Sequence, residues 1–231
     1  MDLLNQEIRD ATRKKLEAEM AGNVRLLLFT QEPRLLVLPG EVPGQECLYC
    51  RETRRLVEEL KALSDKIELE VADFVARKDL AAQYGVDKIP ALLVLGAKPN
   101  GIRFYGIPSG YEYTSLVEAV VDVSRGATGL GEKTKESLAA LNGDVHVQVF
   151  VTPTCPYCTV AVRLGHQMAV ESPHVRCDMI EATEFPHLVQ KYGVYGVPRT
   201  LFNDAASLDG AVAEDAFLAQ VLEAAAAAVK A

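Results

Sequence analysis

Two C-x-x-C pairs are the residues of this chain with the clearest capacity for chemistry. The first pair is Cys47 and Cys50 in CLYC, and the second is Cys155 and Cys158 in CPYC. Two thiols separated by two residues can form a reversible disulfide or bind a metal ion. The pattern therefore indicates either redox chemistry or a metal site.

These features recur along the chain at a constant distance. Cys47 and Cys155 are offset by 155 − 47 = 108 positions, and Pro90 and Pro198 by 198 − 90 = 108. The prolines end the matching segments YGVDKIP and YGVYGVP. Because a cysteine pair and a later proline keep the same spacing in both halves, the chain is interpreted as a tandem duplication.

The duplication bears on the choice between redox and metal chemistry. Zinc sites built from two C-x-x-C pairs usually have about 15–20 residues between the pairs. Here the gap spans a whole domain, and each pair lies inside its own repeat. Redox chemistry is favoured, no metal ligands are predicted, and a zinc site is the least favoured alternative.

The elements that must position these residues alternate along both repeats. In the first repeat we expect helices at 3–21, 48–63, 78–84 and 113–124, and strands at 24–29, 67–75, 91–95 and 101–105. In the second we expect helices at 132–142, 156–170, 184–192 and 214–230, and strands at 145–151, 174–181, 199–203 and 208–212. This order predicts an α/β fold in two tandem domains, 1–124 and 125–231, each with a central mixed β-sheet flanked by helices.

The first repeat carries an insertion ahead of its cysteine pair. VRLLLF at 24–29 and VHVQVF at 145–150 are offset by 121, so the insertion has about 121 − 108 = 13 residues. It lies within 30–46, which holds three prolines and two glycines and therefore reads as a long loop with a short strand at 34–38. Such a loop either covers the first cysteine pair or forms only a surface connection.

The composition excludes several classes of function. A net charge of −8 argues against nucleic acid as a partner, because phosphate binding needs a basic face. No apolar run reaches the roughly 18 residues that span a bilayer, and the N-terminus lacks the pattern of a signal peptide. We therefore expect no membrane partner and a cytoplasmic location. No Gly-rich phosphate loop is present, so no bound flavin or nicotinamide is expected.

The arrangement of these motifs resembles a known family. A C-x-x-C that opens a helix after a strand, followed by an apolar residue and a proline before a later strand, resembles the thioredoxin fold. Two such units with CPYC in the second resemble the protein disulfide oxidoreductases of thermophiles, and VFVTPTCPYC at 149–158 is also similar to glutaredoxin. The resemblance implies two thioredoxin-like domains and thiol–disulfide exchange that reduces, forms or isomerises disulfides in protein substrates. It also implies electrons from NADPH through a thioredoxin-reductase-like flavoprotein, with a peroxiredoxin as a further candidate partner.

The chemistry of exchange assigns a role to each cysteine. One thiolate must attack, and a second thiol must resolve the mixed disulfide. The N-terminus of a helix favours a thiolate, because it carries partial positive charge and free N–H groups. We expect Cys47 and Cys155 to be the exposed attacking residues, and Cys50 and Cys158 to be the more buried resolving residues.

The resemblance adds a substrate-binding role for the two prolines and the residues before them. It implies that Pro90 and Pro198 follow cis peptide bonds and face the dithiols. The backbones of Ile89 and Val197 would then be open to pair with an extended substrate. The buried aspartate that many thioredoxins place six positions before the first cysteine is replaced by Val149 in the second unit, so the sequence assigns no proton acceptor there.

The two sites are expected to be unequal. Glu46 directly precedes Cys47, and a nearby carboxylate opposes a thiolate, whereas Thr154 precedes Cys155. Pro156 also suits the first turn of a helix, where its missing N–H has no cost. We therefore expect Cys155 to be the more acidic cysteine and to carry most of the exchange activity.

Two other functions stay open at this point. The chain could be a dedicated electron relay between a flavoprotein reductase and a peroxidase, or a chaperone-like module that binds substrates through apolar surface near the prolines. Cys177 lies in an expected strand and is interpreted as a small buried apolar residue. The direction of exchange, the reduction potentials, the substrate and the oligomeric state are not encoded in these patterns.

Overall fold

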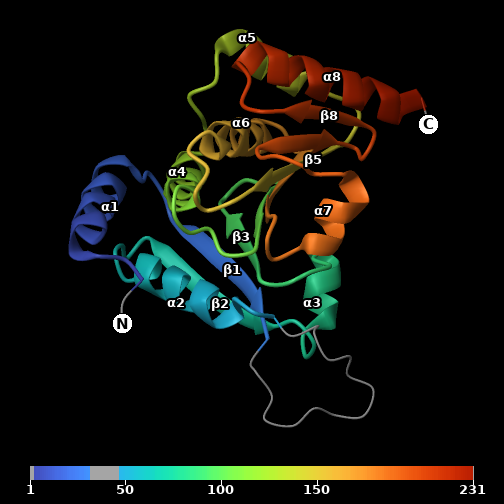
Figure 1. The fold of residues 1–231 in the computed structure, drawn as a ribbon. Helices are drawn as coiled ribbons and strands as arrows, with labels where there is room; N and C mark the ends of the chain where they lie inside the picture. Colours follow the sequence, from blue (N-terminus) through green and yellow to red (C-terminus); the bar gives the residue numbers. More distant parts are fainter. Residues whose placement is uncertain (1–2, 32–46, 231) are drawn as a thin grey trace.

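Strands from both repeats join in one sheet. The structure is a computed structural model that describes residues 3–31 and 47–230. Within this range, eight strands pair in the order β2-β1-β3-β4-β6-β5-β7-β8 (Figure 1). They are β1 (Val24–Thr30), β2 (Ile67–Asp73), β3 (Ala91–Leu95), β4 (Ile102–Tyr105), β5 (Val145–Val151), β6 (Val175–Glu181), β7 (Arg199–Phe202) and β8 (Ala206–Asp209).

Each repeat builds its part of the sheet in the same way. In the first, β1 pairs in parallel with β2 and antiparallel with β3. In the second, β5 pairs in parallel with β6 and antiparallel with β7. This mixed pairing confirms the predicted α/β fold, whereas the division between residues 124 and 125 stays a prediction. The strand expected at 34–38 lies outside the described residues.

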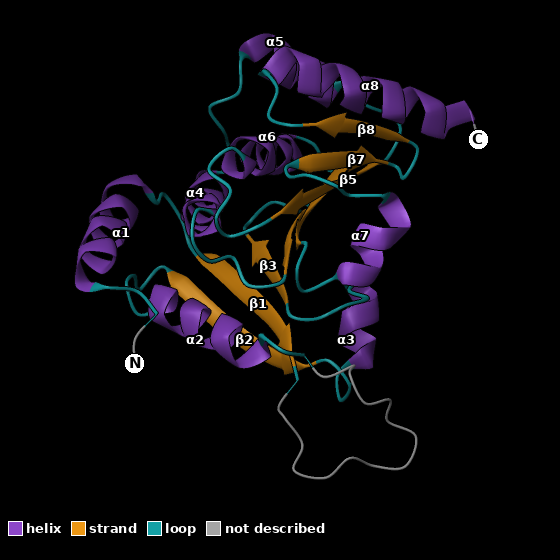
Figure 2. Cartoon of the chain, in the orientation of Figure 1, coloured by secondary structure: helices purple, strands orange, loops and turns teal. Residues whose placement is uncertain are grey.

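The helices cover the two faces of the sheet unequally (Figures 1 and 2). They are α1 (Gln6–Glu19), α2 (Cys50–Lys61), α3 (Lys78–Gln83), α4 (Glu112–Arg125), α5 (Glu132–Ala139), α6 (Cys158–Glu171), α7 (Pro186–Tyr192) and α8 (Glu214–Lys230). The larger hydrophobic core lies on one face, under six of them, with Leu16, Leu56, Leu116, Leu138, Val162 and Phe217 from α1, α2, α4, α5, α6 and α8. The smaller core lies on the other face, under α3 and α7, and contains Ala81, Phe29 and Phe150. The central strands are therefore largely buried on both faces, which explains apolar runs such as LLLF in β1 and ALLVL in β3.

The seam between the repeats is the parallel pair of β4 and β6. Ile102 of β4 lies opposite Cys177 of β6, and the Cys177 N–H donates to the carbonyl oxygen of Gly101 at 2.9 Å. The Cys177 side chain is fully buried against α6, where a Cβ atom on Gly165 would collide with its sulfur. Burial raises the pKa of the Cys177 thiol, which keeps it neutral and agrees with a packing role.

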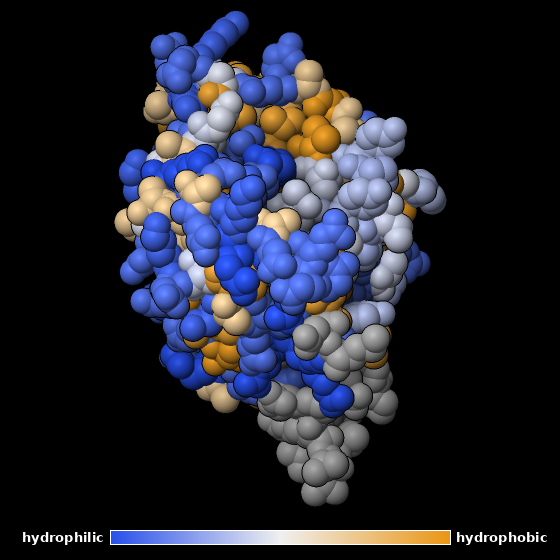
Figure 3. All heavy atoms as spheres, turned by 90° about the vertical axis from the view of Figure 1, so that its left-hand side faces the viewer, coloured by the Kyte–Doolittle hydropathy of each residue, from blue (hydrophilic) through white to orange (hydrophobic). Residues whose placement is uncertain are grey.

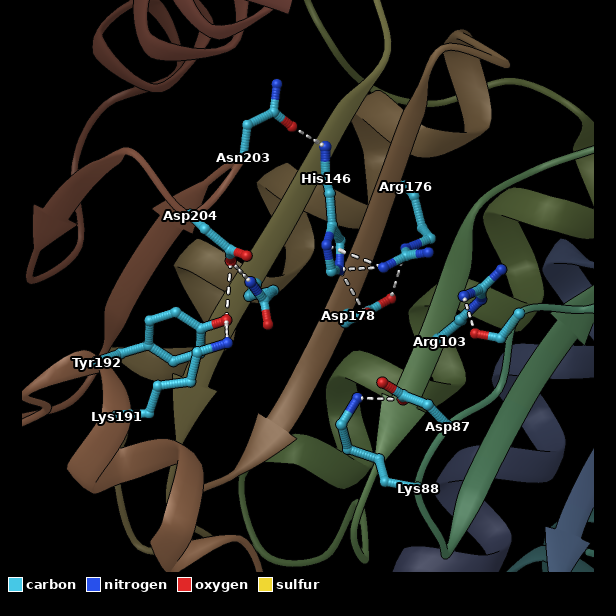
Figure 4. Close-up of polar contacts among 12 residues, drawn as sticks. Asp87, Lys88, Arg103, His146, Arg176, Asp178, Lys191, Tyr192, Asn203 and Asp204 are labelled. Atoms are coloured by element: carbon cyan, nitrogen blue, oxygen red, sulfur yellow. Dashed lines mark hydrogen bonds and ion pairs between the residues drawn. The ribbon is translucent and has the colours of Figure 1, made fainter. Parts of the chain in front are cut away.

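Polar side chains cross the same seam on the sheet face that carries α3 and α7 (Figure 4). Asp178 of β6 is fully buried, and its Oδ2 lies 2.6 Å from His146 Nε2 on β5. Burial alone would raise the pKa of Asp178, but the hydrogen bond with His146 and the charges of Arg176 and Arg103 hold it below its ordinary value. Because Arg103 belongs to β4, this buried carboxylate is stabilised by charges from both repeats.

The outer surface is polar on the side that carries α1 and α2. Figure 3 shows that this side, which lies on the left in Figure 1, is mostly hydrophilic, with scattered apolar side chains. Among the residues that the structure describes, no helix combines the length and apolar character needed to cross a bilayer.

Candidate active sites

Both C-x-x-C pairs are disulfides in the structure. Cys47 is bonded to Cys50 and Cys155 to Cys158, with Cα–Cα distances of 5.4 Å and 5.5 Å. In each pair the first cysteine is half-buried and the second is almost completely buried. This difference in burial is the one expected if the first sulfur attacks substrates and the second, more buried sulfur resolves the mixed disulfide.

The helices begin later than the sequence predicts. α2 starts at Cys50 and α6 at Cys158, so the first cysteine of each pair lies in the turn before the helix. Pro156 precedes the N-cap residue Tyr157, and its expected place in the first helical turn is wrong by this assignment. The reason is that the turn closed by the disulfide takes up the first three residues of each motif. Cys47 and Cys155 still lie at the positive end of a helix dipole.

A cis peptide bond precedes each of the two repeated prolines. The bonds are Ile89–Pro90 and Val197–Pro198. At the second site Cys155 Sγ lies 3.8 Å from the carbonyl oxygen of Val197, so the sequence-predicted neighbours meet. Among the described residues, the Val197 N–H donates to no other backbone carbonyl. This N–H is therefore left unpaired with the backbone of the described chain, and an added strand could use it.

Both dithiols lie at the same edge of the sheet. β1, β4, β6 and β5 are mutually parallel through the pairings across the sheet, so their carboxyl ends share one edge. Cys155 follows β5, and at the end of β1 the Gln31 N–H donates to Cys50 Sγ at 3.4 Å. Because β1 and β5 are four strand spacings apart, the two sites are separated by about 19 Å at the level of the strands.

A buried carboxylate that the sequence did not point to lies at the start of α4. Glu112 is 1% exposed, and neither of its carboxylate oxygens has a hydrogen-bond partner among the described residues. Burial raises the pKa of Glu112 to about 7. A glutamate in the first turn of a helix is common, so only its burial distinguishes this one.

The packing of two helices places Glu112 at the end of the molecule that carries the second site. Arg163 of α6 pairs with Glu118 of α4 at 3.1 Å, and one turn further along both helices Asp122 hydrogen-bonds with Gln167, so α4 and α6 lie side by side and run in the same direction. Their first turns, which carry Glu112 and Cys158, therefore lie at the same end. The Tyr111 N–H also donates to the carbonyl oxygen of Pro153 at 3.0 Å, which ties the start of α4 to the CPYC turn.

Two further acids, Glu181 and Glu184, lie between the two sites, where β4 and β6 end. Glu184 Oε1 accepts the Ile107 N–H at 2.6 Å, which links the repeats. Burial raises the pKa of Glu184 to about 7, and the nearby charges of Glu181 and Glu52 add to this effect. Glu181 and its counterpart Asp73 both accept N–H groups of the turn that follows their strands, as strand-end acids commonly do. Among the described residues, no group of His, Cys, Asp and Glu side chains is arranged to hold a metal ion.

Comparison with known proteins identifies the family of this fold. A family model described as a thioredoxin domain matches residues 145–223. The crystal structure of a protein disulfide oxidoreductase from Aeropyrum pernix k1 is similar with a TM-score of 0.86 and 32% identity, covering 98% of this chain and 95% of that one. The chain belongs to the protein disulfide oxidoreductase family. Membership in this family confirms the resemblance noted in the sequence and the two tandem thioredoxin-like units.

Members of a second group of redox proteins share the same tandem fold. The structure of the alkylhydroperoxide reductase protein AhpF from Enterococcus faecalis is similar with a TM-score of 0.83 and 25% identity, over 95% of this chain and 100% of that one. A protein named NADH dehydrogenase from Bacillus subtilis is 26% identical over 166 residues, which are 72% of this chain and 30% of that protein. The chain thus spans about 30% of the length of the first curated relatives that it matches.

Proposed function

We propose that this chain is a thiol–disulfide oxidoreductase that reduces, forms or rearranges disulfides in protein substrates through its two dithiols. The observation that supports this most directly is the second site, where Cys155 Sγ lies 3.8 Å from the carbonyl oxygen of Val197 beside a cis proline. This geometry places a redox-active sulfur beside the unpaired backbone N–H of Val197. A polypeptide paired with that backbone would carry its own disulfide to the sulfur.

In the reductive direction, the Cys155 thiolate attacks one sulfur of the substrate disulfide. The substrate S–S bond breaks, a mixed disulfide forms, and the other substrate sulfur leaves as a thiolate. The Cys158 thiolate then attacks the sulfur of Cys155, which breaks the mixed disulfide and releases the second substrate thiolate. Two electrons pass from the dithiol to the substrate, and an external dithiol reductant restores the enzyme. The same steps in reverse form a substrate disulfide.

The remaining roles follow from burial and position. Cys47 and Cys50 act as the attacking and resolving pair of the first site, in agreement with their half-buried and buried positions. The backbone of the Ile89–Pro90 segment, and that of Val197–Pro198 at the second site, binds the substrate. These segments carry the specificity for extended chains, because pairing through the backbone does not depend on side-chain identity.

Glu112 acts as the proton acceptor of Cys158. A buried thiol needs a nearby base before it can attack the mixed disulfide. The Glu112 carboxylate is buried, and its burial raises its pKa to about 7. A group with this pKa gives and takes a proton readily at neutral pH.

Electrons reach the dithiols from NADPH through a flavoprotein of the thioredoxin-reductase type. The similarity to proteins named NADH dehydrogenase and alkyl hydroperoxide reductase supports a nicotinamide-linked electron source. The same similarity favours a second candidate function, in which the chain relays electrons to a peroxidase such as a peroxiredoxin. We place either function in the cytoplasm, and we assign the two sites to separate domains, 1–124 and 125–231.

Reduction of insulin disulfides in dithiothreitol tests the general function. The wild type should accelerate the precipitation of reduced insulin chains, and a variant with all four motif cysteines changed to Ser should not. The Cys177→Ser variant is the matched control, because Cys177 is buried and belongs to neither motif. Equal rates with and without the wild-type protein would contradict a general disulfide reductase.

The relay function has its own test. NADPH consumption is followed with a thioredoxin reductase, the chain, and either insulin or a peroxiredoxin with peroxide. Fast consumption with the peroxiredoxin and slow consumption with insulin would favour the relay. The opposite pattern would favour the general oxidoreductase.

A further inference from the structure

Four segments close to Cys155 carry only uncharged side chains. The segments that meet around Cys155 are 153–160, which contains the motif, and 193–198, which ends at the cis proline. Residues 108–111 lie next to the motif segment, because the Tyr111 N–H donates to the carbonyl oxygen of Pro153. Residues 210–213 lie next to the proline segment, because the Gly210 N–H donates to the carbonyl oxygen of Pro198 at 2.8 Å. None of these four segments contains Asp, Glu, Lys, Arg or His.

Three of these segments each present an exposed tyrosine. Tyr195 is 100% exposed, Tyr157 is 70% exposed and Tyr111 is 51% exposed. A single exposed aromatic side chain is ordinary on a protein surface. Three of them on separate segments around one dithiol form a set, which we name the tyrosine rim. Tyr195 contributes no buried area to the fold, so packing does not account for its type.

The counterpart position in the first repeat shows what the same loop can carry instead. With the offset of 108, Tyr195 and Gly196 correspond to Asp87 and Lys88. Figure 4 shows Asp87 and Lys88 pointing toward each other, with Lys88 Nζ 2.5 Å from Asp87 Oδ1. Lys88 Nζ also lies 3.9 Å from the centre of the Tyr105 ring, which draws this side chain back onto the sheet. The first loop is therefore charged and held in place, and the second is neutral and projecting.

The motif helices differ in the same sense. Arg51 and Glu52, which follow the first cysteine pair, correspond to Thr159 and Val160 after the second. Val160 is exposed, so the apolar surface continues from the tyrosine rim onto the first turn of α6. Charged residues of the first repeat are thus replaced by uncharged ones on two segments that flank the sulfur of Cys155. This indicates that the surface that these segments form beside Cys155 is uncharged.

We propose that the tyrosine rim binds an extended polypeptide whose side chains around the reactive cysteine are apolar and uncharged, with Tyr195 as the residue that determines this specificity. The inference rests on the proposed exchange function and names the substrate class of its second site. Tyr195 lies three residues before Pro198, within about 10 Å along the backbone. An extended substrate covers that distance with about three residues, so Tyr195 contacts side chains close to the attacked sulfur. A charged side chain there would lose water and gain no partner.

The test measures selectivity at the second site alone. The parent is the full chain with Cys47→Ser and Cys50→Ser, reduced before use. The probes are two eight-residue peptides with one cysteine protected as a 2-pyridyl disulfide, flanked either by Leu and Phe or by Asp and Lys. Methyl 2-pyridyl disulfide, which has no peptide, normalises each rate for the reactivity of Cys155. Release of 2-thiopyridone gives the second-order rate constant.

The parent should react faster with the apolar peptide than with the charged one. Tyr195→Ala should lower the normalised rate with the apolar peptide by roughly tenfold, the size typical of an aromatic contact at the centre of an interface. Tyr195→Phe should keep most of the rate, because the ring carries the contact. Replacing Tyr195 and Gly196 together by the Asp and Lys of the first repeat should remove the preference for the apolar peptide.

The outcomes separate this inference from the function on which it rests. If the parent does not release 2-thiopyridone from methyl 2-pyridyl disulfide, the second site lacks exchange chemistry and the proposed function fails. If the parent reacts with that probe but Tyr195→Ala keeps the same ratio between the two peptides, the tyrosine rim does not select the substrate and only this inference is overturned.

Discussion

The two dithiol sites share their geometry and differ in their surroundings. Both have a half-buried first cysteine, a buried second cysteine at the start of a helix, and a cis proline. At the first site the loop before the proline carries the ion pair of Asp87 with Lys88, and at the second it carries the exposed Tyr195. The duplicated fold therefore keeps the reacting atoms in place, while the loops around them are free to choose different partners.

A second difference concerns the source of the buried acid. At the second site Glu112 comes from α4, in the first repeat, so one repeat supplies a carboxylate to the other. Near the first site the corresponding buried acid is Glu184 of the second repeat, which accepts the Ile107 N–H and whose raised pKa of about 7 includes the nearby charge of Glu52 on α2. With Glu112 as the proton acceptor proposed above, the second site would depend on the assembly of the two repeats for its proton chemistry.

The largest expected effect concerns the attacking cysteines. Cys155→Ser should remove most of the insulin reduction and leave the rate of the first site, whereas changing both Cys47 and Cys155 to Ser should lower it by about a hundredfold or more, because a hydroxyl does not replace a thiolate as a nucleophile. Cys47→Ser should keep most of the wild-type rate if the second site dominates. The rates are measured by turbidity in dithiothreitol at equal protein concentration. A greater loss in Cys47→Ser would reverse the ranking of the two sites.

The seam offers a test of whether the repeats fold as one unit. Asp178→Asn should lower the free energy of unfolding by about 3 kcal/mol at pH 7, because it breaks a buried pair and leaves cationic partners uncompensated. Asp144→Asn, at an ion pair whose carboxylate is 90% exposed, is the control and should change little. Urea unfolding followed by circular dichroism should give one transition for each protein. Two transitions, with only the later repeat affected, would contradict a single folding unit.

The pH dependence of that loss has a definite sign. The pKa of Asp178 in the folded chain lies below its ordinary value of 3.8, so its contribution is present above that pH. As the pH falls through the folded-state pKa, the carboxylate is protonated and the contribution is lost. The difference between wild type and Asp178→Asn should therefore narrow in acid. A difference that stays constant below pH 4 would contradict the ionised state of Asp178.

Glu112 allows a sharper separation of the two sites. Glu112→Gln should slow reduction at the second site by about tenfold. This is less than the usual effect of removing a general base, because a thiol also loses its proton to water. In the parent the rate should rise with pH through about 7, where Glu112 loses its proton and becomes a base. The variant should lack this rise. First-site activity is measured in a protein with Cys155 and Cys158 changed to Ser, and adding Glu112→Gln should leave its rate unchanged.

Stability distinguishes this catalytic effect from damage to the fold. The folded-state pKa of Glu112 is about 7, above its ordinary value of 4.5, so folding favours its protonated form. That favourable contribution is complete below pH 4.5 and is lost as the pH rises through about 7. Glu112→Gln should therefore be at least as stable as the wild type at pH 8. Marked destabilisation at that pH would assign Glu112 a structural role instead.

The smallest expected effect is a difference in acidity between the attacking cysteines. Cys155 should be alkylated by iodoacetamide at lower pH than Cys47, because Thr154 precedes it where Glu46 precedes Cys47. The half-maximal pH of each residue is read from mass spectra of peptides after brief alkylation of the reduced chain. Identical profiles would remove acidity as a cause of the inequality and leave the surrounding surface as its cause.

The sequence predicted the parts of this molecule that depend on local patterns. The offset of 108 identified the cysteines and prolines, and apolar runs such as LLLF at 26–29 located the buried strands. The starts of α2 and α6 were misplaced, because the disulfide-closed turn overrides the helical pattern at the first cysteines. Element boundaries depend on such local closures more than on propensity.

The features that the sequence did not predict depend on contacts between segments that are distant along the chain. The pairing of β4 with β6 merges two sheets into one, and nothing in the four residues Ile102–Tyr105 specifies that partner. Glu112 is an ordinary residue at a helix start by sequence, and only the packing of α4 beside α6 distinguishes it. The expected loop across most of 30–46, and whether it covers the first site, lies largely outside the described residues and stays a prediction.

The shared edge of the sheet makes the chain a bivalent reagent. The strands that precede the two dithiols are about 19 Å apart across one hydrogen-bonded sheet, so a polypeptide held at one site meets the other at an effective concentration on the order of millimolar. Free protein dithiols are far more dilute than this. A substrate with two disulfides is therefore expected to exchange its second one before it dissociates. The parallel seam between β4 and β6, which fixes that separation, sets the length of chain over which such processive exchange can occur.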